Sequence, residues 1–345
     1  MSQDTTADSS AHSRLVQAPP QDRLGVLTET ARVVRAARFV RLDRPALGAL
    51  AARWAAVAWP EQAGLGAWHF TDGTERGANW ILVLDALNFC FWGAPGGPRW
   101  RVEWRGQLLD GYNALAAALT RAVESGRPLW DAEYLADLSA SELADILRPA
   151  EDCPPIPLFE ARLAHAREVG RVLQSHYGGQ FVRARAAAGG SAVALALLLA
   201  RDFPSFADVA NWHGEAVPLL KRAQICVADL HAAFGGQGWG AFDDLDQLTA
   251  FADYKLPQLL RAHGALVYAP ELAAAVDSYT EIPAGSDEEI EIRAATIWAV
   301  ELLRRALAAR GVSRTASAID YRLWVESQTA TPDMRPYHRT CTVYY

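Results

Sequence analysis

The chain has 345 residues, of which 51% are apolar and 12 are tryptophan, so it is long and apolar enough to bury a sizeable core. Its formal net charge of −7 argues against a protein that binds duplex DNA or RNA by neutralising phosphates, although a small anionic ligand needs only a few cations. The cysteines and histidines are dispersed without a Cys-x-x-Cys or His-x-x-x-His pair, which indicates neither a disulfide framework nor a metal site and favours a reducing cytoplasm.

The first third of the chain predicts a tail, two helices and a strand. Residues 1–22 are polar and lack the apolar core of a signal peptide, so we expect a disordered tail. Helical spacing follows over residues 26–39 and 45–58. Residues 79–92 are almost all apolar and fit a buried helix or a buried strand. Residues 99–105 alternate apolar and charged side chains, which is typical of a half-buried strand.

The middle of the chain carries a helix start, a boundary signal and an apolar run. Ser139, followed by Glu142 three residues later, predicts a capping box at the start of a helix. The proline-rich segment 153–157 is the best candidate for a boundary between two lobes. Residues 186–200 are strongly apolar but too short to span a membrane, so we expect a buried helix there.

The last third reads mostly as helix. Helices are predicted over residues 218–236, over 285–311 behind a second capping box, and over 317–328. The final residues, 340–345, are apolar enough to add one more strand. The whole pattern predicts a single, mainly α domain with a small β element over residues 23–345.

Several motifs with well-defined chemistry are absent. The chain contains no Gly-x-Gly-x-x-Gly, no Gly-x-x-x-x-Gly-Lys-Ser/Thr and no Gly-x-Ser-x-Gly. A dinucleotide cofactor, a P-loop NTPase and an α/β-hydrolase are therefore disfavoured. Carboxylates, aromatic rings and a few cations remain as candidates for chemistry.

Four of these candidates each admit a structural and a functional interpretation. Asp320 shares a predicted helix face with apolar side chains, so it is either a paired or cap-bonded carboxylate or a desolvated group for acid–base or electrostatic work. Asp253 precedes a short helix and is either its cap or a site residue. Lys221, next to Arg222, belongs either to a solvated face or to a phosphate anchor. His69 lies among aromatic residues and is either a satisfied core histidine or a catalyst.

Longer blocks of the sequence resemble one known family. They occur in the order VLDALNFCFW, GYNALAAALTRA, LLKRAQICVADL, FADYKLPQLLRAHGAL, EIEIRAATIWAVELL, IDYRLWV and YHRTCTVYY. In this order they are similar to the queuosine salvage protein family, the queuosine 5′-phosphate N-glycosylase/hydrolases, from about residue 65 to the end of the chain. The resemblance implies a fold similar to the helix-hairpin-helix DNA glycosylases. It also implies hydrolysis of the N-glycosidic bond of queuosine 5′-monophosphate, with release of queuine for tRNA modification.

The resemblance also implies roles for individual residues, and it bears on localisation, oligomeric state and cofactor use. Eukaryotic relatives carry an acidic residue directly after the IDYRLW motif, where this chain has Val325 followed by Glu326, so contacts to the cyclopentenediol arm of the substrate are not implied. We expect a cytoplasmic monomer that uses no cofactor and no metal and binds neither nucleic acid nor a membrane. A non-catalytic binder of queuine or its nucleotide and a repair-type DNA glycosylase are the alternatives. The implied roles are Asp320 as nucleophile or stabiliser of the ribosyl cation, Tyr321 beside it in the pocket, Phe251 and Asp253 on the base, Lys221 on the 5′-phosphate, and His69 in substrate binding.

Overall fold

The computed structural model describes residues 16–60, 65–329 and 334–345, which form two compact units. Each unit is assembled from segments that are distant in the sequence. The segments are Met1–Glu61, Val209–Lys221 and Asp246–Cys341 in unit 1, and Gln62–Asp208, Arg222–Leu245 and Thr342–Tyr345 in unit 2.

The N-terminal tail predicted over residues 1–22 falls mainly on residues 1–15, which lie outside the described part of the chain. Within its remainder, Val16 is buried and its carbonyl accepts a hydrogen bond from Arg35 (2.9 Å). The proline-rich segment 153–157 lies inside unit 2.

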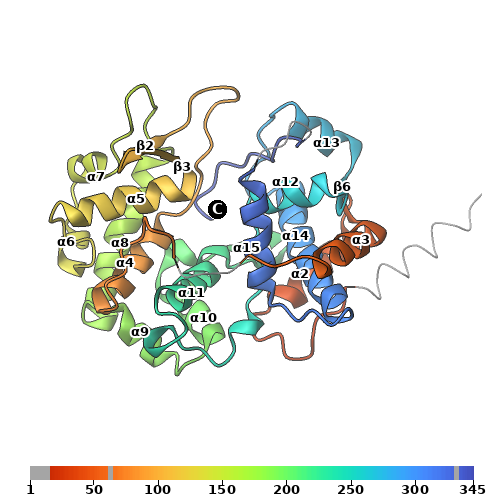
Figure 1. The fold of residues 1–345 in the computed structure, drawn as a ribbon, viewed down its shortest axis with the longest axis horizontal. Coiled ribbons are helices and arrows are strands. Elements are labelled where there is room, and N and C mark those ends of the chain that lie inside the picture. Colours follow the sequence, from red (N-terminus) through yellow and green to blue (C-terminus); the bar gives the residue numbers. More distant parts are fainter. Residues whose placement is uncertain (1–15, 61–64, 330–333) are drawn as a thin grey trace, which may run out of the picture. The chain divides into compact units, whose positions relative to one another are not determined.

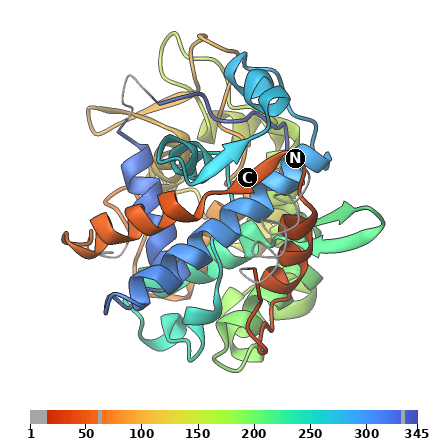
Figure 2. The same cartoon turned by 90° about the vertical axis from the view of Figure 1, so that its right-hand side faces the viewer.

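Unit 1 is built around one buried helix, α14 (Asp287–Ala308). Its first turn is capped by Ser286, whose hydroxyl accepts from the N–H of Glu289 (3.3 Å), as the sequence predicts. Most of α14 is buried, and it packs against α2, α3, α12, α15 and β1 (Figures 1 and 2). The other elements of unit 1 are α2 (Val26–Ala36), β1 (Val40–Leu42), α3 (Arg44–Ala55), β4 (Val209–Trp212), β5 (Glu215–Pro218), α12 (Lys255–Ala262), β6 (Leu266–Tyr268), α13 (Pro270–Asp277) and α15 (Ala316–Ser327), and the short turn η3 (Leu245–Gln247) lies where the two units join in the sequence.

Two small antiparallel pairs complete unit 1. β1 pairs with β6, with Val40 opposite Tyr268, and β4 pairs with β5 as a hairpin. Glu291, from α14, fixes the chain that enters β1. Its carboxylate accepts from the main-chain N–H groups of Phe39 (2.6 Å), Arg38 (3.0 Å) and Val40 (3.1 Å).

Unit 2 is also mainly helical, and one of its helix pairs is unusually close. A Cβ atom on Gly170 of α8 would collide with the backbone of Ala132 and Ala136 in α6, so this contact requires glycine. The elements of unit 2 are α4 (Glu75–Ala86), β2 (Arg101–Trp104), β3 (Gln107–Asp110), α5 (Gly111–Glu124), α6 (Ala132–Ala136), α7 (Ala140–Ile146), α8 (Phe159–Tyr177), α9 (Phe181–Ala187), α10 (Ala192–Asp202), η1 (Pro204–Phe206), η2 (Gly238–Gly240) and α11 (Lys221–Ala233) from its second residue on.

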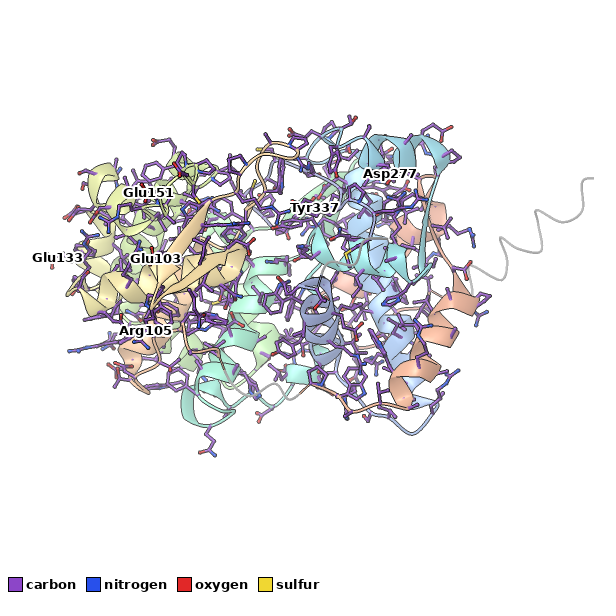
Figure 3. The ribbon with its side chains drawn as sticks, turned by 45° about the horizontal axis from the view of Figure 1, so that its top comes forward. Glu103, Arg105, Glu133, Glu151, Asp277 and Tyr337 are labelled. Carbon is purple, nitrogen blue, oxygen red and sulfur yellow. The ribbon has the colours of Figure 1, made fainter. Side chains whose placement is uncertain are left out.

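The predicted strand over residues 99–105 forms a hairpin with β3. Val102 and Trp104 are buried, whereas Arg101 and Glu103 are exposed, which confirms the alternation. Figure 3 labels Glu103 and Arg105 on this hairpin. Arg105 lies over the Trp104 ring (4.2 Å) and pairs with Glu124 (2.6 Å), so the turn is held to α5.

Three further expectations can be compared with the structure. The capping box at Ser139 is confirmed, since Ser139 and Glu142 exchange both hydrogen bonds at the start of α7. The single buried helix expected over 186–200 is wrong, because Gly189 and Gly190 adopt positive φ (61° and 89°) and separate α9 from α10. The final strand is also wrong: residues 340–345 are irregular, although Tyr345 is buried and its carbonyl accepts from the N–H of Cys90 (2.8 Å).

Candidate functional site

Asp320 is a buried carboxyl group on α15. Thr315 caps this helix by accepting from the N–H of Ala318 (3.1 Å), which places Asp320 just over one turn from the start of the helix, on its inward face. The side chain is 6% exposed, and its Oδ2 accepts from the main-chain N–H of Phe251 (2.7 Å). Within the described residues Asp320 forms no ion pair, so the salt-bridge interpretation is wrong.

Electrostatics make the charged form of Asp320 costly. Burial and the neighbouring charge of Asp253 raise its pKa well above the usual range of an aspartate, while the Phe251 N–H and the charge of Lys221 act in the opposite direction. A carboxylate whose charge is only partly compensated gains most from a positive charge in a ligand. This is the electrostatic pattern expected of a functional carboxylate.

Asp253 supplies a side-chain cap to α12, although Tyr254 stands between it and the first helical residue, Lys255. Its Oδ1 accepts from the N–H groups of Lys255 (2.8 Å) and Leu256 (3.0 Å), so the cap interpretation is confirmed in geometry. Within the part of the chain that the structure describes, no group donates to Oδ2. The cap therefore occupies one oxygen and leaves the other able to accept from a ligand. Burial raises the pKa of Asp253, and the nearby Lys221 lowers it.

Lys221 is the first residue of α11 and is buried, with 5% exposure, so the solvated-face interpretation is wrong. Leu220 before it has a positive φ of 51°, which turns the chain into the helix. The charge of Lys221 lowers the pKa of both Asp253 and Asp320, which places the ammonium group within electrostatic range of the two carboxylates. The next residue, Arg222, is fully buried in unit 2 and donates to the carbonyl of Ala86 (2.5 Å).

Aromatic side chains accompany these charges in unit 1. Phe251 is 6% exposed and precedes Asp253 by two residues. Tyr321 follows Asp320 on α15, is partly exposed, and stacks on Trp324 with ring centroids 6.3 Å apart. Five of the six residues singled out from the sequence thus belong to unit 1.

His69 belongs to unit 2 and has partners on both ring nitrogens. Nε2 lies 2.9 Å from the Tyr112 hydroxyl, which donates to Asp229 Oδ2 (2.9 Å), and Nδ1 lies 3.0 Å from the Gly66 carbonyl. Burial lowers the pKa of His69 to about 4. The ring is therefore neutral at physiological pH and has partners on both nitrogens, but the residue is half-buried rather than part of the core.

Sequence reasoning missed Arg293, Tyr112 and Asp229. Arg293 is 2% exposed and lies on the most deeply buried helix of unit 1. A charged residue in the apolar repeat of residues 290–300 was a usable signal, because a buried charge needs a specific partner. Tyr112 and Asp229 gave no comparable signal, since they meet only through the tertiary fold.

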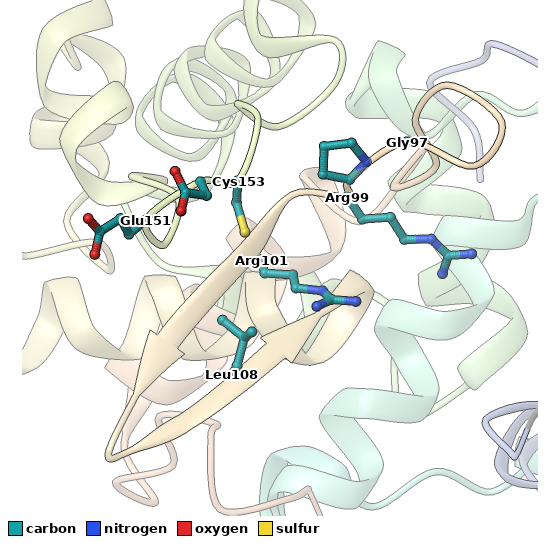
Figure 4. Close-up of a pocket in the computed structure, with 8 residues that line it drawn as sticks. Gly97, Arg99, Arg101, Leu108, Glu151 and Cys153 are labelled. Carbon is teal, nitrogen blue, oxygen red and sulfur yellow. The ribbon is translucent and has the colours of Figure 1, made fainter.

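A cavity of about 350 Å³ lies in unit 2 beside the β2–β3 hairpin (Figure 4). Its charged side chains are mixed and exposed: Arg99 and Arg101 are accompanied by Glu151 and Asp152. None of the residues singled out from the sequence lines it. Among the described residues, no helix is long and apolar enough to cross a membrane.

Comparison with known proteins agrees with the sequence blocks. The sequence model of a family described as "Queuosine salvage protein" matches residues 68–345. The chain is 52% identical to a protein of Sphaerobacter thermophilus, over 95% of this chain and 100% of the relative. It is 37% identical to a protein of Mus musculus (79% and 82% covered) and 36% identical to one of Schizosaccharomyces pombe (71% and 73% covered). All three relatives are named queuosine 5′-phosphate N-glycosylase/hydrolase. The chain belongs to the queuosine salvage protein family.

Proposed function

We propose that this protein is an N-glycosyl hydrolase that cleaves queuosine 5′-monophosphate with water into queuine and ribose 5-phosphate. The observation that carries this proposal is Asp320, a buried carboxyl group with a raised pKa beside Phe251 and Asp253. The names of the relatives supply the substrate.

The reaction needs a negative charge beneath the sugar. Cleavage of the bond between C1′ and the base leaves a ribosyl group with oxocarbenium character, as glycoside hydrolysis does. Asp320 would attract this developing cation more strongly than it attracts the neutral sugar, and such differential binding lowers the barrier. Water then supplies the hydroxyl group at C1′ and the proton that the departing base takes up.

The base needs help of a particular kind. Queuine is a 7-deazaguanine, so it lacks the N7 atom that an enzyme could protonate to make a purine a better leaving group. Hydrogen bonds donated to the base must do more of that work, and recognition of its guanine-like edge is a separate task. We assign Asp253 as acceptor for the N1–H and 2-amino donors through Oδ2, and Phe251 as the stacking partner of the ring.

The remaining three residues are assigned to the phosphate, to the sugar and to substrate binding more generally. Lys221, at the N-terminus of α11, would bind the 5′-phosphate, because an ammonium group and the N–H groups of a helix start both favour an anion. Tyr321 would contact the sugar beside Asp320. His69 remains a substrate-binding residue by the family resemblance, and its neutral imidazole suits hydrogen bonding rather than charge pairing.

The test follows both products in isotopically labelled water. Incubation with queuosine 5′-monophosphate in H₂¹⁸O should release free queuine and place one ¹⁸O on C1′ of ribose 5-phosphate. Label in the phosphate instead would mean phosphatase action and would refute the proposal. Tight binding without turnover would favour the non-catalytic binder, and turnover of damaged duplex DNA would favour the repair enzyme.

We further propose that the protein works as a cytoplasmic monomer without cofactor or nucleic acid, and that its helices follow the plan of the helix-hairpin-helix DNA glycosylases. The net charge of −7 supports the exclusion of nucleic acid. Sedimentation velocity tests the monomer, and a gel shift with duplex DNA at low salt tests the exclusion.

A further inference from the structure

Residues 251–253 are held by three different helices of unit 1. The N–H of Phe251 donates to Asp320 on α15, the carbonyl of Ala252 accepts from Arg293 on α14, and the side chain of Asp253 caps α12. These three helices also pack against one another, and all three are labelled in Figure 1. We call residues 251–253 the reading segment, because the proposed function assigns the base to its first and third side chains.

Arg293 makes the middle of these contacts from a buried position. Its Nε lies 3.2 Å from the Ala252 oxygen, and its Nη1 lies 3.6 Å from Glu289 Oε1, one turn earlier on α14. Glu289 is in turn fixed by the helix start, where its own N–H donates to Ser286 and its Oε2 accepts from the N–H of Gly285 (3.2 Å). The guanidinium group is therefore anchored at both ends.

Burying an arginine to hold a backbone carbonyl is energetically costly. Removing a guanidinium group from water costs several kcal/mol, which its ion pair and hydrogen bonds only partly return. A planar guanidinium in a fixed pair nevertheless sets the direction of its N–H bonds more closely than a lysine would. This arrangement is suited to holding a backbone in place for a ligand rather than to stabilising the fold.

We propose that Arg293 is a positioning residue of the hydrolase. Through the Ala252 carbonyl it fixes the two backbone torsions on either side of that residue. Asp253 follows Ala252 in the chain, and Phe251 precedes it. The position of Ala252 therefore sets the position of the Asp253 side chain, of the Phe251 ring and of the Phe251 N–H that donates to Asp320. In this role Arg293 acts through the reading segment rather than on the substrate itself. The proposal rests on the proposed function, because that function assigns the reading segment to the base.

The consequence is a coupled effect on base affinity and on chemistry. If the reading segment moves, the contacts of Phe251 and Asp253 with the base weaken, and Asp320 loses its fixed hydrogen bond. Misplacement by about 1 Å costs on the order of a hundredfold in rate in positioned sites. A residue that only stabilised the fold would lower the melting temperature and leave the kinetics of the folded fraction unchanged.

The experiment compares Arg293→Lys with Arg261→Lys. Arg261 is a matched control, since it is an arginine of the same unit with intermediate exposure and a 9% exposed side chain, and it pairs with Asp277 (2.7 Å; Asp277 is labelled in Figure 3). For each variant we would measure the melting temperature, kcat, KM, and the inhibition constant of free queuine, which reports base binding apart from chemistry. Arg293→Lys is expected to raise the inhibition constant and to lower kcat, each by about tenfold or more. Arg261→Lys should change both by less than about twofold.

Two results would overturn the proposal. One is an Arg293→Lys variant whose kcat and inhibition constant stay within about twofold of wild type while its melting temperature falls. The other is an equal kinetic loss in both variants. If Arg293→Lys does not fold, the double variant Glu289→Gln/Arg293→Gln removes both charges and is read in the same way.

A failure of the proposed function would look different, because the wild-type protein itself would release no queuine. Calorimetric titration with queuine then tests Arg293 alone. Weaker binding by Arg293→Lys than by wild type supports the positioning role, whereas equal binding, or no binding by the wild type, overturns it.

Discussion

Replacing Asp320 by asparagine separates the charge of this residue from its shape. Asparagine has nearly the same volume, and its side-chain carbonyl can still accept from the N–H of Phe251, which lies 2.7 Å from Oδ2 in the native protein. Only the negative charge, which we propose to lie beneath C1′ of the substrate, is lost. Two unit charges about 4 Å apart at an effective dielectric constant of about 20 attract each other by about 4 kcal/mol. At about 1.4 kcal/mol per decade, kcat is expected to fall by about a thousandfold.

The same substitution should leave the protein at least as stable at neutral pH. The pKa of Asp320 is raised in the folded state, so the folded protein binds more protons than the unfolded chain between the ordinary aspartate pKa and the raised value. Over that window the free energy of unfolding falls as the pH rises. Asparagine carries no charge and escapes this loss. The melting temperature of the variant relative to wild type should therefore increase with pH across the window.

The assay is single-turnover release of queuine, together with melting curves from pH 4 to pH 8. Glu291→Gln is the matched control, because Glu291, on α14, is a second buried acid whose pKa is raised by burial while its main-chain N–H partners lower it. It should keep kcat within about twofold, since its contacts are to the chain that enters β1. An Asp320→Asn variant with kcat within about tenfold of wild type, or with a melting temperature that drops relative to wild type as the pH rises, would refute the reasoning.

Four further outcomes are expected. Lys221→Met should lower kcat/KM on the monophosphate by about 10- to 100-fold, the loss of one charge-assisted contact, and should affect the free nucleoside much less; equal losses would contradict a phosphate role. Asp253→Asn keeps an acceptor for the cap of α12, so its melting temperature should stay near wild type while kcat/KM falls by about tenfold, whereas Asp253→Ala should also lose about 1 kcal/mol of stability. Because the pKa values of Asp253 and Asp320 are both raised, kcat/KM should increase with pH over a range above the usual aspartate pKa, which we call the acidic limb. Lys221→Met should move this limb to higher pH, since the charge of Lys221 lowers both pKa values. A limb that does not move would argue against electrostatic coupling of Lys221 to the two carboxylates. His69, with a pKa of about 4, is neutral across that limb, so His69→Gln should raise KM without shifting it, and a shift in the pH profile would show that His69 titrates there.

The helices and their starts were readable from short stretches of sequence. The capping box at Ser139, the Ser286 cap of α14 and the alternating strand over residues 99–105 depend on contacts between residues a few positions apart. Such contacts form in the same way wherever the segment lies in the fold. The reciprocal half of the box predicted at Ser286 is absent among the described contacts, because the Glu289 carboxylate accepts from the N–H of Gly285 instead. The helix predicted over 186–200 was wrong because the apolar composition of the run outweighed its two glycines, and the positive φ angles of Gly189 and Gly190 end one helix before the next begins.

The residue types of the site were also visible in the sequence, but their burial, pKa shifts and hydrogen-bond partners were not. Asp320 stood out as a carboxylate on an apolar helix face, and its place in the site came from the family resemblance. Its bond to Phe251 joins residues 69 positions apart, and no local pattern encodes that pairing. The burial of Lys221 was equally invisible. Lys221 and Arg222 are adjacent cations, a pattern typical of a solvated helix face, yet both are buried.

The sequence by itself determined the helical character of the chain, its main helix caps, its family and the residue types at the proposed site. Only the tertiary structure decided how Asp253 serves a cap with one oxygen and leaves the other for a ligand, why the pKa of Asp320 is raised, and which buried arginine holds the reading segment. The physical reason is the separation in sequence of the residues that interact. Helix formation and capping are settled within a few residues, whereas burial, charge coupling and a guanidinium group on a distant carbonyl exist only once separate helices have packed together.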